Sequence, residues 1–78
     1  MKVIFSEKKD FAYIALDVSG DDIVAKTRPC KVNGMKGEVN LDFNKNDFLL
    51  GIRIIGASKI LPKALLEKAE RAQDAMLI

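Results

Sequence analysis

Residues 41–61 hold two apolar runs on either side of a polar turn, and this stretch constrains the fold more than any other. The turn, Asn-Lys-Asn-Asp at 44–47, is rich in the residues that hairpin turns favour. Beyond the second run the chain reaches Pro62, which suits the first turn of a helix because a missing N–H costs nothing there. The stretch therefore predicts a β-hairpin that leads into a helix. In its second strand, the residues expected to face the core are Phe48, Leu50, Ile52 and Ile54.

Short patterned segments predict the remaining strands. Residues 2–5 indicate a first strand, and residues 11–18, rich in aromatic and β-branched side chains, a second. Roughly residues 23–32 form a third, and its charged side chains and Pro29 favour a place at the sheet edge. Residues 37–43 alternate strictly, which is typical of a strand with one wet face. The side chains expected on that wet face are Glu38, Asn40 and Asp42.

One C-terminal helix is expected to follow residue 61. Its apolar stripe recurs at helical spacing through Leu61, Leu65, Ala69, Ala72 and Met76. The sequence thus predicts an α+β fold, an antiparallel β-meander of four to five strands with one C-terminal α-helix packed on one face. A chain of this length forms a single domain, residues 1–78, and buries only roughly 60% of its unfolded surface.

The composition limits both the cellular compartment and the kinds of catalytic or metal site that can be expected. Cys30 is the only cysteine, so no intrachain disulfide can form, and no apolar run approaches membrane-spanning length. We therefore expect a cytoplasmic protein. The chain contains no histidine, the commonest general base and metal ligand, so neither an enzyme nor a metal or cofactor site is expected. A packed Cys30 is favoured over a reactive thiol.

The aspartates that follow the second strand allow two interpretations. They could hold a cation, but the spacing of a calcium-binding loop and its distal glutamate are absent. A solvated turn is favoured, because aspartate forms local hydrogen bonds that stabilise turns. The residues concerned are Asp17, Asp21 and Asp22.

Two motifs span most of the chain, leaving about residues 19–37 unmatched. The first comprises Phe5, Asp10, Tyr13-Ile14 and Leu16. The second comprises Leu41-Asp42-Phe43, the turn at 44–47, Gly51-Ile52-x-Ile54 and Ala57-Ser58. Together they resemble the YuzE-like family, small bacterial and archaeal domains of uncharacterised function. The resemblance implies the hairpin-and-helix fold, and some similar proteins look like antitoxins encoded beside small toxins.

Three positions depart from the pattern of that family. Asp47 stands where the family tends to have glycine, Arg53 where it usually has glutamate, and Gly56 where an acidic residue is common. A site that the family builds from carboxylates would therefore differ in this chain, and Arg53 would change the partner.

The leading hypothesis is a small non-catalytic protein-binding module of antitoxin or immunity type. One helix covers one face of a sheet, and the other face keeps apolar side chains that suit a homodimer or a partner protein. The residues predicted to bind there are Phe11, Tyr13, Leu49, Arg53 and Ile55. For Tyr13, a packed aromatic at the sheet rim and an interface anchor are equally weighted alternatives.

The alternative hypothesis is a nucleic-acid-binding regulator. The densest basic segment lies on and after the predicted edge strand and would supply Lys26, Arg28, Lys31 and Lys36. Charged residues that protect an edge strand from aggregation explain the same pattern and are favoured. The net charge of +2 also falls short of a dense basic footprint.

Overall fold

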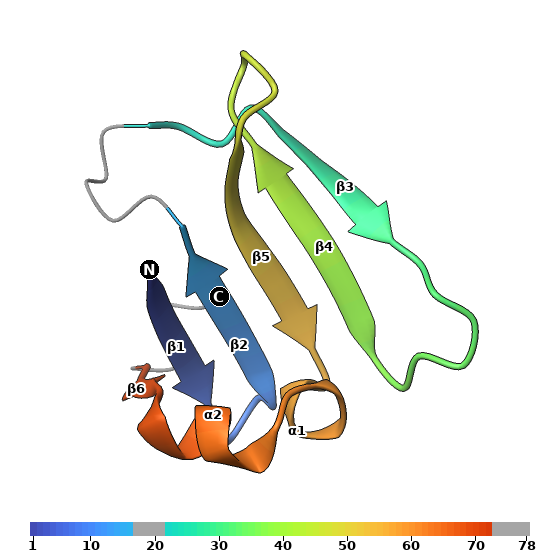
Figure 1. Cartoon of the computed structure of the whole chain (residues 1–78), viewed down its shortest axis with the longest axis vertical. Coiled ribbons are helices and arrows are strands. Elements are labelled where there is room, and N and C mark those ends of the chain that lie inside the picture. The colour runs from blue at the N-terminus through green and yellow to red at the C-terminus, as the bar shows by residue number, and fades with distance from the viewer. Residues whose placement is uncertain (17–21, 73–78) are drawn as a thin grey trace.

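The structure is a computed structural model that describes residues 1–16 and 22–72, and it shows one mostly antiparallel six-stranded sheet with two short helices (Figure 1). The predicted α+β fold class is confirmed. In chain order the elements are β1 Lys2–Ser6, β2 Phe11–Ala15, β3 Lys26–Cys30, β4 Glu38–Phe43, β5 Leu49–Ile55, α1 Ala57–Ile60, α2 Lys63–Lys68 and β6 Glu70–Arg71. No helix of the described ranges is long and apolar enough to cross a bilayer.

The strands lie in the order β3-β4-β5-β2-β1-β6. The β4–β5 hairpin is confirmed at the centre of the sheet, and β3 occupies the edge that Pro29 predicted. The order refines the predicted meander at one point, because β2 pairs with β5 rather than with β3. All neighbours are antiparallel except β1 and β6, which are parallel.

The position of Pro29 within β3 explains why this strand ends the sheet. In antiparallel sheets, successive residues of a strand bond alternately to the strand on one side and to the strand on the other. The Leu16 N–H donates to the Leu50 carbonyl at 2.9 Å, and this bond fixes which residues of β5 bond to β2 and which bond to β4. Following the registers from β4 to β3, the backbone groups of Thr27 and Pro29 point away from β4. The N–H that proline lacks would therefore have faced the free edge, where its loss breaks no ladder and discourages another strand from pairing.

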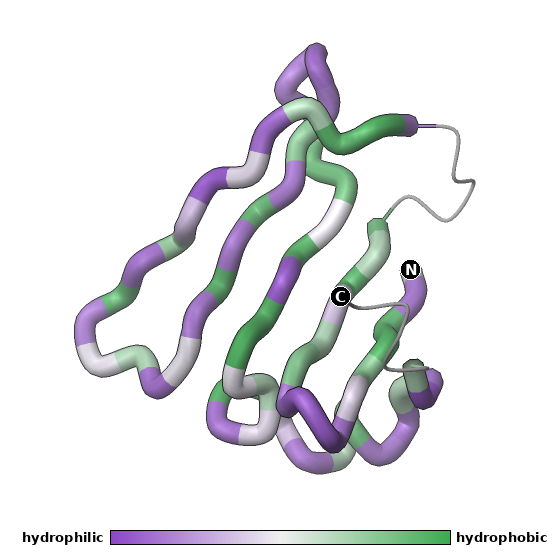
Figure 2. The backbone as a smooth tube through the Cα atoms, turned by 180° about the vertical axis from the view of Figure 1, so that it is seen from behind, coloured by the Kyte–Doolittle hydropathy of each residue, from purple (hydrophilic) through white to green (hydrophobic). Residues whose placement is uncertain are grey.

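The two faces of the sheet differ in what covers them. On one side, here called the covered face, Phe5, Ala12 and Ile54 pack with Ala57 and Leu66 of the two helices to form the buried core. Figure 1 shows both helices gathered at one end of β1, β2 and β5. The opposite side, here called the open face, carries no helix of the described residues. Figure 2 shows hydrophilic residues recurring along β3 and β4, the strands furthest from the helices.

The single long helix predicted for the C-terminus is wrong within the described residues. Helix α1 is one turn after Gly56, and α2 ends at Lys68, since Ala69 is already extended with ψ 151°. The chain then forms β6 beside β1, and the Ala72 N–H donates to the Phe5 carbonyl at 3.1 Å. Pairing with the unsatisfied edge of β1 outweighs the helical preference of these residues. Residues 73–78, including Met76 of the predicted stripe, lie outside the described residues.

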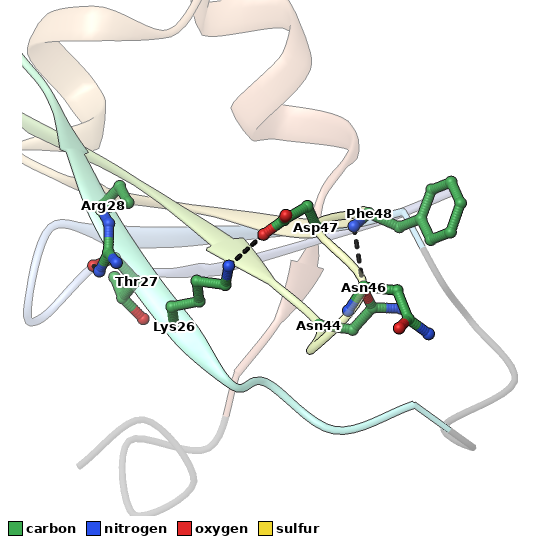
Figure 3. Close-up of polar contacts among 7 residues, drawn as sticks. All are labelled: Lys26, Thr27, Arg28, Asn44, Asn46, Asp47 and Phe48. Carbon is green, nitrogen blue, oxygen red and sulfur yellow. Dashed lines mark hydrogen bonds and ion pairs between the residues drawn. The ribbon is translucent and has the colours of Figure 1, made fainter.

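The turn between β4 and β5 also corrects one prediction about the core. Phe48 was expected to face the core, but 68% of it is exposed and its ring points away from the sheet (Figure 3). Asn44 causes this arrangement, because its buried side-chain oxygen accepts the backbone N–H groups of Asn46 and Phe48 at 2.9 and 3.0 Å. The turn therefore holds Phe48 outside the strand, and the buried set starts at Leu50.

Candidate functional site

Four of the five residues predicted to bind a partner share the open face. In the register of β2 and β5, Tyr13 lies opposite Arg53 and Phe11 lies opposite Ile55. Arg53 and Ile55 are exposed, Ile55 at 45%, and Phe11 and Tyr13 are half-buried. Leu49 is half-buried and lies opposite Phe43, beyond a register shift that follows Asp42, so the alternation of β5 no longer assigns it to this face.

A buried aspartate lies at the centre of this face. Asp42 was expected on a wet face, and that expectation is wrong in one respect: it shares the side of Asn40 but has no solvent exposure. The Thr27 hydroxyl donates to Asp42 Oδ1 at 2.6 Å, and Arg53 Nε donates to Oδ2 at 2.7 Å. A buried carboxylate is stable only when donors satisfy it, so the contacts from β3 and β5 are what allow Asp42 to occupy this position.

Tyr13 reaches the same carboxylate from β2 by crossing over Gly51. A Cβ on Gly51 would lie 2.0 Å from the Tyr13 hydroxyl oxygen, so only glycine leaves room for the phenol. Burial raises the pKa of the Tyr13 hydroxyl above its ordinary value of 10.0, and the negative charge of Asp42 and a hydrogen bond to it add to the rise, against the opposing effect of Arg53. The hydroxyl therefore stays protonated at neutral pH and acts as a donor.

The resulting cluster takes one side chain from each of four adjacent strands: Thr27 from β3, Asp42 from β4, Arg53 from β5 and Tyr13 from β2. The carboxylate of Asp42 has no solvent exposure and accepts from Thr27 and Arg53, so it orients its neighbours rather than contacting a ligand itself. The group it presents to solvent is the guanidinium of Arg53, whose side chain is 47% exposed. Oriented guanidinium groups recognise carboxylates and phosphates.

A second network ties the β1–β2 turn to α1. Asp10 has φ 50°, and its carbonyl accepts the N–H groups of Gly56 and Ala57. Its carboxylate accepts both the N–H and the hydroxyl of Ser58 at 2.8 Å. Asp10 therefore holds the first helix against the sheet.

The basic residues of the alternative hypothesis are not gathered around the aromatic side chains. Lys26 of β3 forms an ion pair with Asp47 of the turn between β4 and β5 (Figure 3). The Nη1 of Arg28 donates to the Thr27 carbonyl at 3.3 Å. Both side chains leave β3 on the side opposite the open face. Lys31 and Lys36 are exposed in the connection from β3 to β4.

The remaining candidates carry little chemistry. Cys30 is half-buried and lines a cavity of about 610 Å³ beside the β3–β4 connection. Across residues 1–16 and 22–72, no group of three or more potential metal ligands comes together. Asp17 and Asp21 lie outside the described residues, and Asp22 accepts a hydrogen bond from the Asn44 amide at 3.0 Å.

Residues 2–58 match the family model described as "Protein of unknown function (DUF2283)". The chain belongs to the DUF2283 family. In this DUF2283 chain the matched span runs from β1 to the first turn of α1 and contains both networks, the one around Asp42 and the one that joins Asp10 to Ser58. No match was found among curated proteins or among solved structures.

Sequence reasoning missed the centre of the cluster. Thr27, Asp42 and Gly51 were not predicted as site residues, although Asp42 and Gly51 belong to the motifs quoted for the resemblance. The sequence signal that could have found Asp42 and Gly51 is that they belong, like Tyr13, to the two motifs quoted for the resemblance, although these motifs lie far apart in the chain. The structure shows that Tyr13 lies over Gly51, close enough to hydrogen-bond Asp42.

Proposed function

We propose that this DUF2283 chain is a non-catalytic protein-binding module and that the open face is its contact surface. The observation that supports this proposal best is the composition of that face: apolar Phe11 and Ile55 lie beside Tyr13 and an oriented, exposed Arg53. Tyrosine and arginine are enriched among residues that dominate binding energy at protein interfaces.

The chemistry of the cluster also favours recognition over catalysis. Tyr13 keeps its proton because its pKa is raised, and the carboxylate of Asp42 is fully buried behind its donors. A general base must instead reach its substrate in a deprotonated form. The proposal accordingly includes no catalytic residue.

The partner can be specified further through the YuzE-like resemblance. It supports an antitoxin or immunity role in the cytoplasm, in which the open face would cover a small toxin encoded beside this gene. A nucleic-acid-binding regulator is the alternative. It would have to use Arg28, Lys31 and Lys36, since Asp47 already neutralises Lys26.

The test is the solution mass, measured by light scattering for the wild type and for two matched variants. Ile55→Asp places a charge on the open face, and Phe48→Asp makes a similar change at an exposed residue of the hairpin turn. We expect a wild-type dimer that Ile55→Asp dissociates and Phe48→Asp preserves. Tyr13→Asp is less suitable, because it would bring a second carboxylate next to buried Asp42.

If the wild type is a monomer and a small toxin-like protein is encoded beside this gene, the same two variants are coexpressed with that protein. The proposal then predicts that Ile55→Asp loses the toxin and Phe48→Asp retains it. Equal behaviour of the two variants in both experiments would contradict a binding role for the open face.

A further inference from the structure

The guanidinium of Arg53 is held from one side only. Its Nε donates to Asp42, and neither Nη nitrogen has a hydrogen-bond or ion-pair partner among the residues that the structure describes. Because the group is planar and Nε is fixed, the two Nη nitrogens project in a set direction from the open face. This geometry suits two parallel hydrogen bonds to a carboxylate.

The same face carries a carboxylate that lacks a partner. Glu38 lies on β4 opposite Ile55, two register positions from the pair formed by Asn40 and Arg53. Its side chain is exposed and forms no hydrogen bond or ion pair within the described chain. The open face thus offers one oriented cation and one free anion, displaced from each other along the strands.

We propose that the partner of the open face is a second copy of this chain, in which Glu38 of each copy binds the Nη edge of Arg53 of the other. This inference rests on the proposed function and identifies the partner. Two-fold interfaces are self-complementary, so one offset pair of opposite charges produces two ion pairs across a single axis. Sheets pack face to face at about 10 Å, which brings such side chains within reach.

Apolar contacts supply the rest of the interface. Ile55 and Phe11 lie opposite each other on β5 and β2, beside the charged pair, and would pack against their copies across the two-fold axis. The ion pairs fix the register of the two sheets, since a shifted register would leave both Arg53 and Glu38 without a partner at the interface.

The experiment is a double-mutant cycle on the dimer dissociation constant, measured by light scattering over a dilution series. The variants are Glu38→Gln, Arg53→Gln and the double variant, and Glu67→Gln on exposed α2 is the matched control. We expect Glu38→Gln to raise the dissociation constant about tenfold or more, and Glu67→Gln to leave it unchanged. Any weakening that Arg53→Gln causes through Asp42 cancels in the cycle.

The cycle should show strong coupling: in the Arg53→Gln background, Glu38→Gln should have little further effect on dissociation. Independent effects of the two substitutions would overturn the pairing. The same cycle is measured on the unfolding midpoint of the diluted monomer, where coupling equal to that in the dimer would show a contact within one chain and would also overturn it.

Failure of the pairing and failure of the proposed function give different results. If Ile55→Asp dissociates the dimer while Glu38→Gln does not, the open face binds but the ion pair is excluded. If the wild type is a monomer at every concentration, the second copy is excluded as partner, and the toxin coexpression tests the open face separately. A dimer that Ile55→Asp leaves intact would exclude both.

Discussion

The two faces of this sheet are built from the same strands, but different interactions stabilise the side chains on each face. On the covered face, Ala12 and Ile54 are buried by apolar contacts with α1 and α2. On the open face, the most deeply buried group is Asp42, and it accepts hydrogen bonds from Thr27 and Arg53 on the two neighbouring strands. Apolar packing stabilises one face, whereas the polar cluster on the other face fixes the direction of exposed side chains.

Adjacent residues on β5 give the largest expected contrast. Ile54 is 3% exposed on the covered face, and Ile55 is 45% exposed on the open face. Ile54→Ala should lower the free energy of unfolding by about 2–5 kcal/mol, because it leaves a cavity in the core. Ile55→Ala should lower it by less than about 1 kcal/mol. Urea denaturation of both variants, at dilutions where the protein is monomeric, measures the contrast, and equal losses would contradict the division between the faces.

Gly51→Ala tests the polar cluster through its geometry. The added Cβ would overlap the Tyr13 hydroxyl, so the phenol must leave its place above β5 and lose contact with Asp42. We expect a loss of about 1–3 kcal/mol in unfolding free energy, as for other overpacked sites. In a Tyr13→Ala background the same substitution should cost much less. A loss independent of Tyr13 would show that strand geometry at residue 51 is responsible.

Tyr13→Phe removes one donor from Asp42 and changes the pH dependence of stability. The hydrogen bond should contribute about 1 kcal/mol near neutral pH. Because the folded-state pKa of Tyr13 is raised above 10.0, its contribution is fully present below that value and is lost as the pH rises toward the folded-state pKa. Above about pH 10, wild-type stability should therefore fall more steeply with rising pH than that of the variant.

The absorbance of ionised tyrosine provides an independent reading of the same group. Tyr13 is the only tyrosine and the chain has no tryptophan, so the titration reports this side chain alone. The folded protein should ionise at higher pH than the urea-unfolded chain. Identical titrations would mean that Tyr13 is not buried against Asp42.

The smallest effect is expected at the hairpin turn. Asp47 has φ 68°, a left-handed conformation that glycine adopts more easily. Asp47→Gly relieves this conformation but removes the exposed ion pair with Lys26 and loosens the unfolded chain. We expect a change within about 0.5 kcal/mol in either direction. Thermal unfolding measures this change in stability, and a larger loss of stability would mean that the ion pair between Asp47 and Lys26 stabilises the fold.

The fold class, the edge position of β3 and the shared face of Tyr13 and Arg53 were predictable because they depend on local patterns. Strand alternation placed Tyr13 and Arg53 on one face, and Pro29 marked the edge strand. The burial of Asp42 was not predictable, because it requires Thr27 and Tyr13 to reach it from strands far away in sequence.

The early end of the helix has the same kind of cause. The residues after Lys68 keep a helical pattern, but β1 offers an unpaired edge that only the folded sheet presents. Local propensity cannot anticipate a competitor that tertiary structure creates.

One face of β5 packs in the core that stabilises the fold, and we propose that the other face binds the partner. The most direct measurement follows the methyl resonances of Ile54 and Ile55 by NMR as the protein is diluted. The account predicts that the Ile55 methyl signals shift with the dissociation of the dimer, while those of Ile54 stay in place because its core surroundings are unchanged. Signals of Ile55 that do not respond to dilution, or a response of Ile54 as large as that of Ile55, would contradict it.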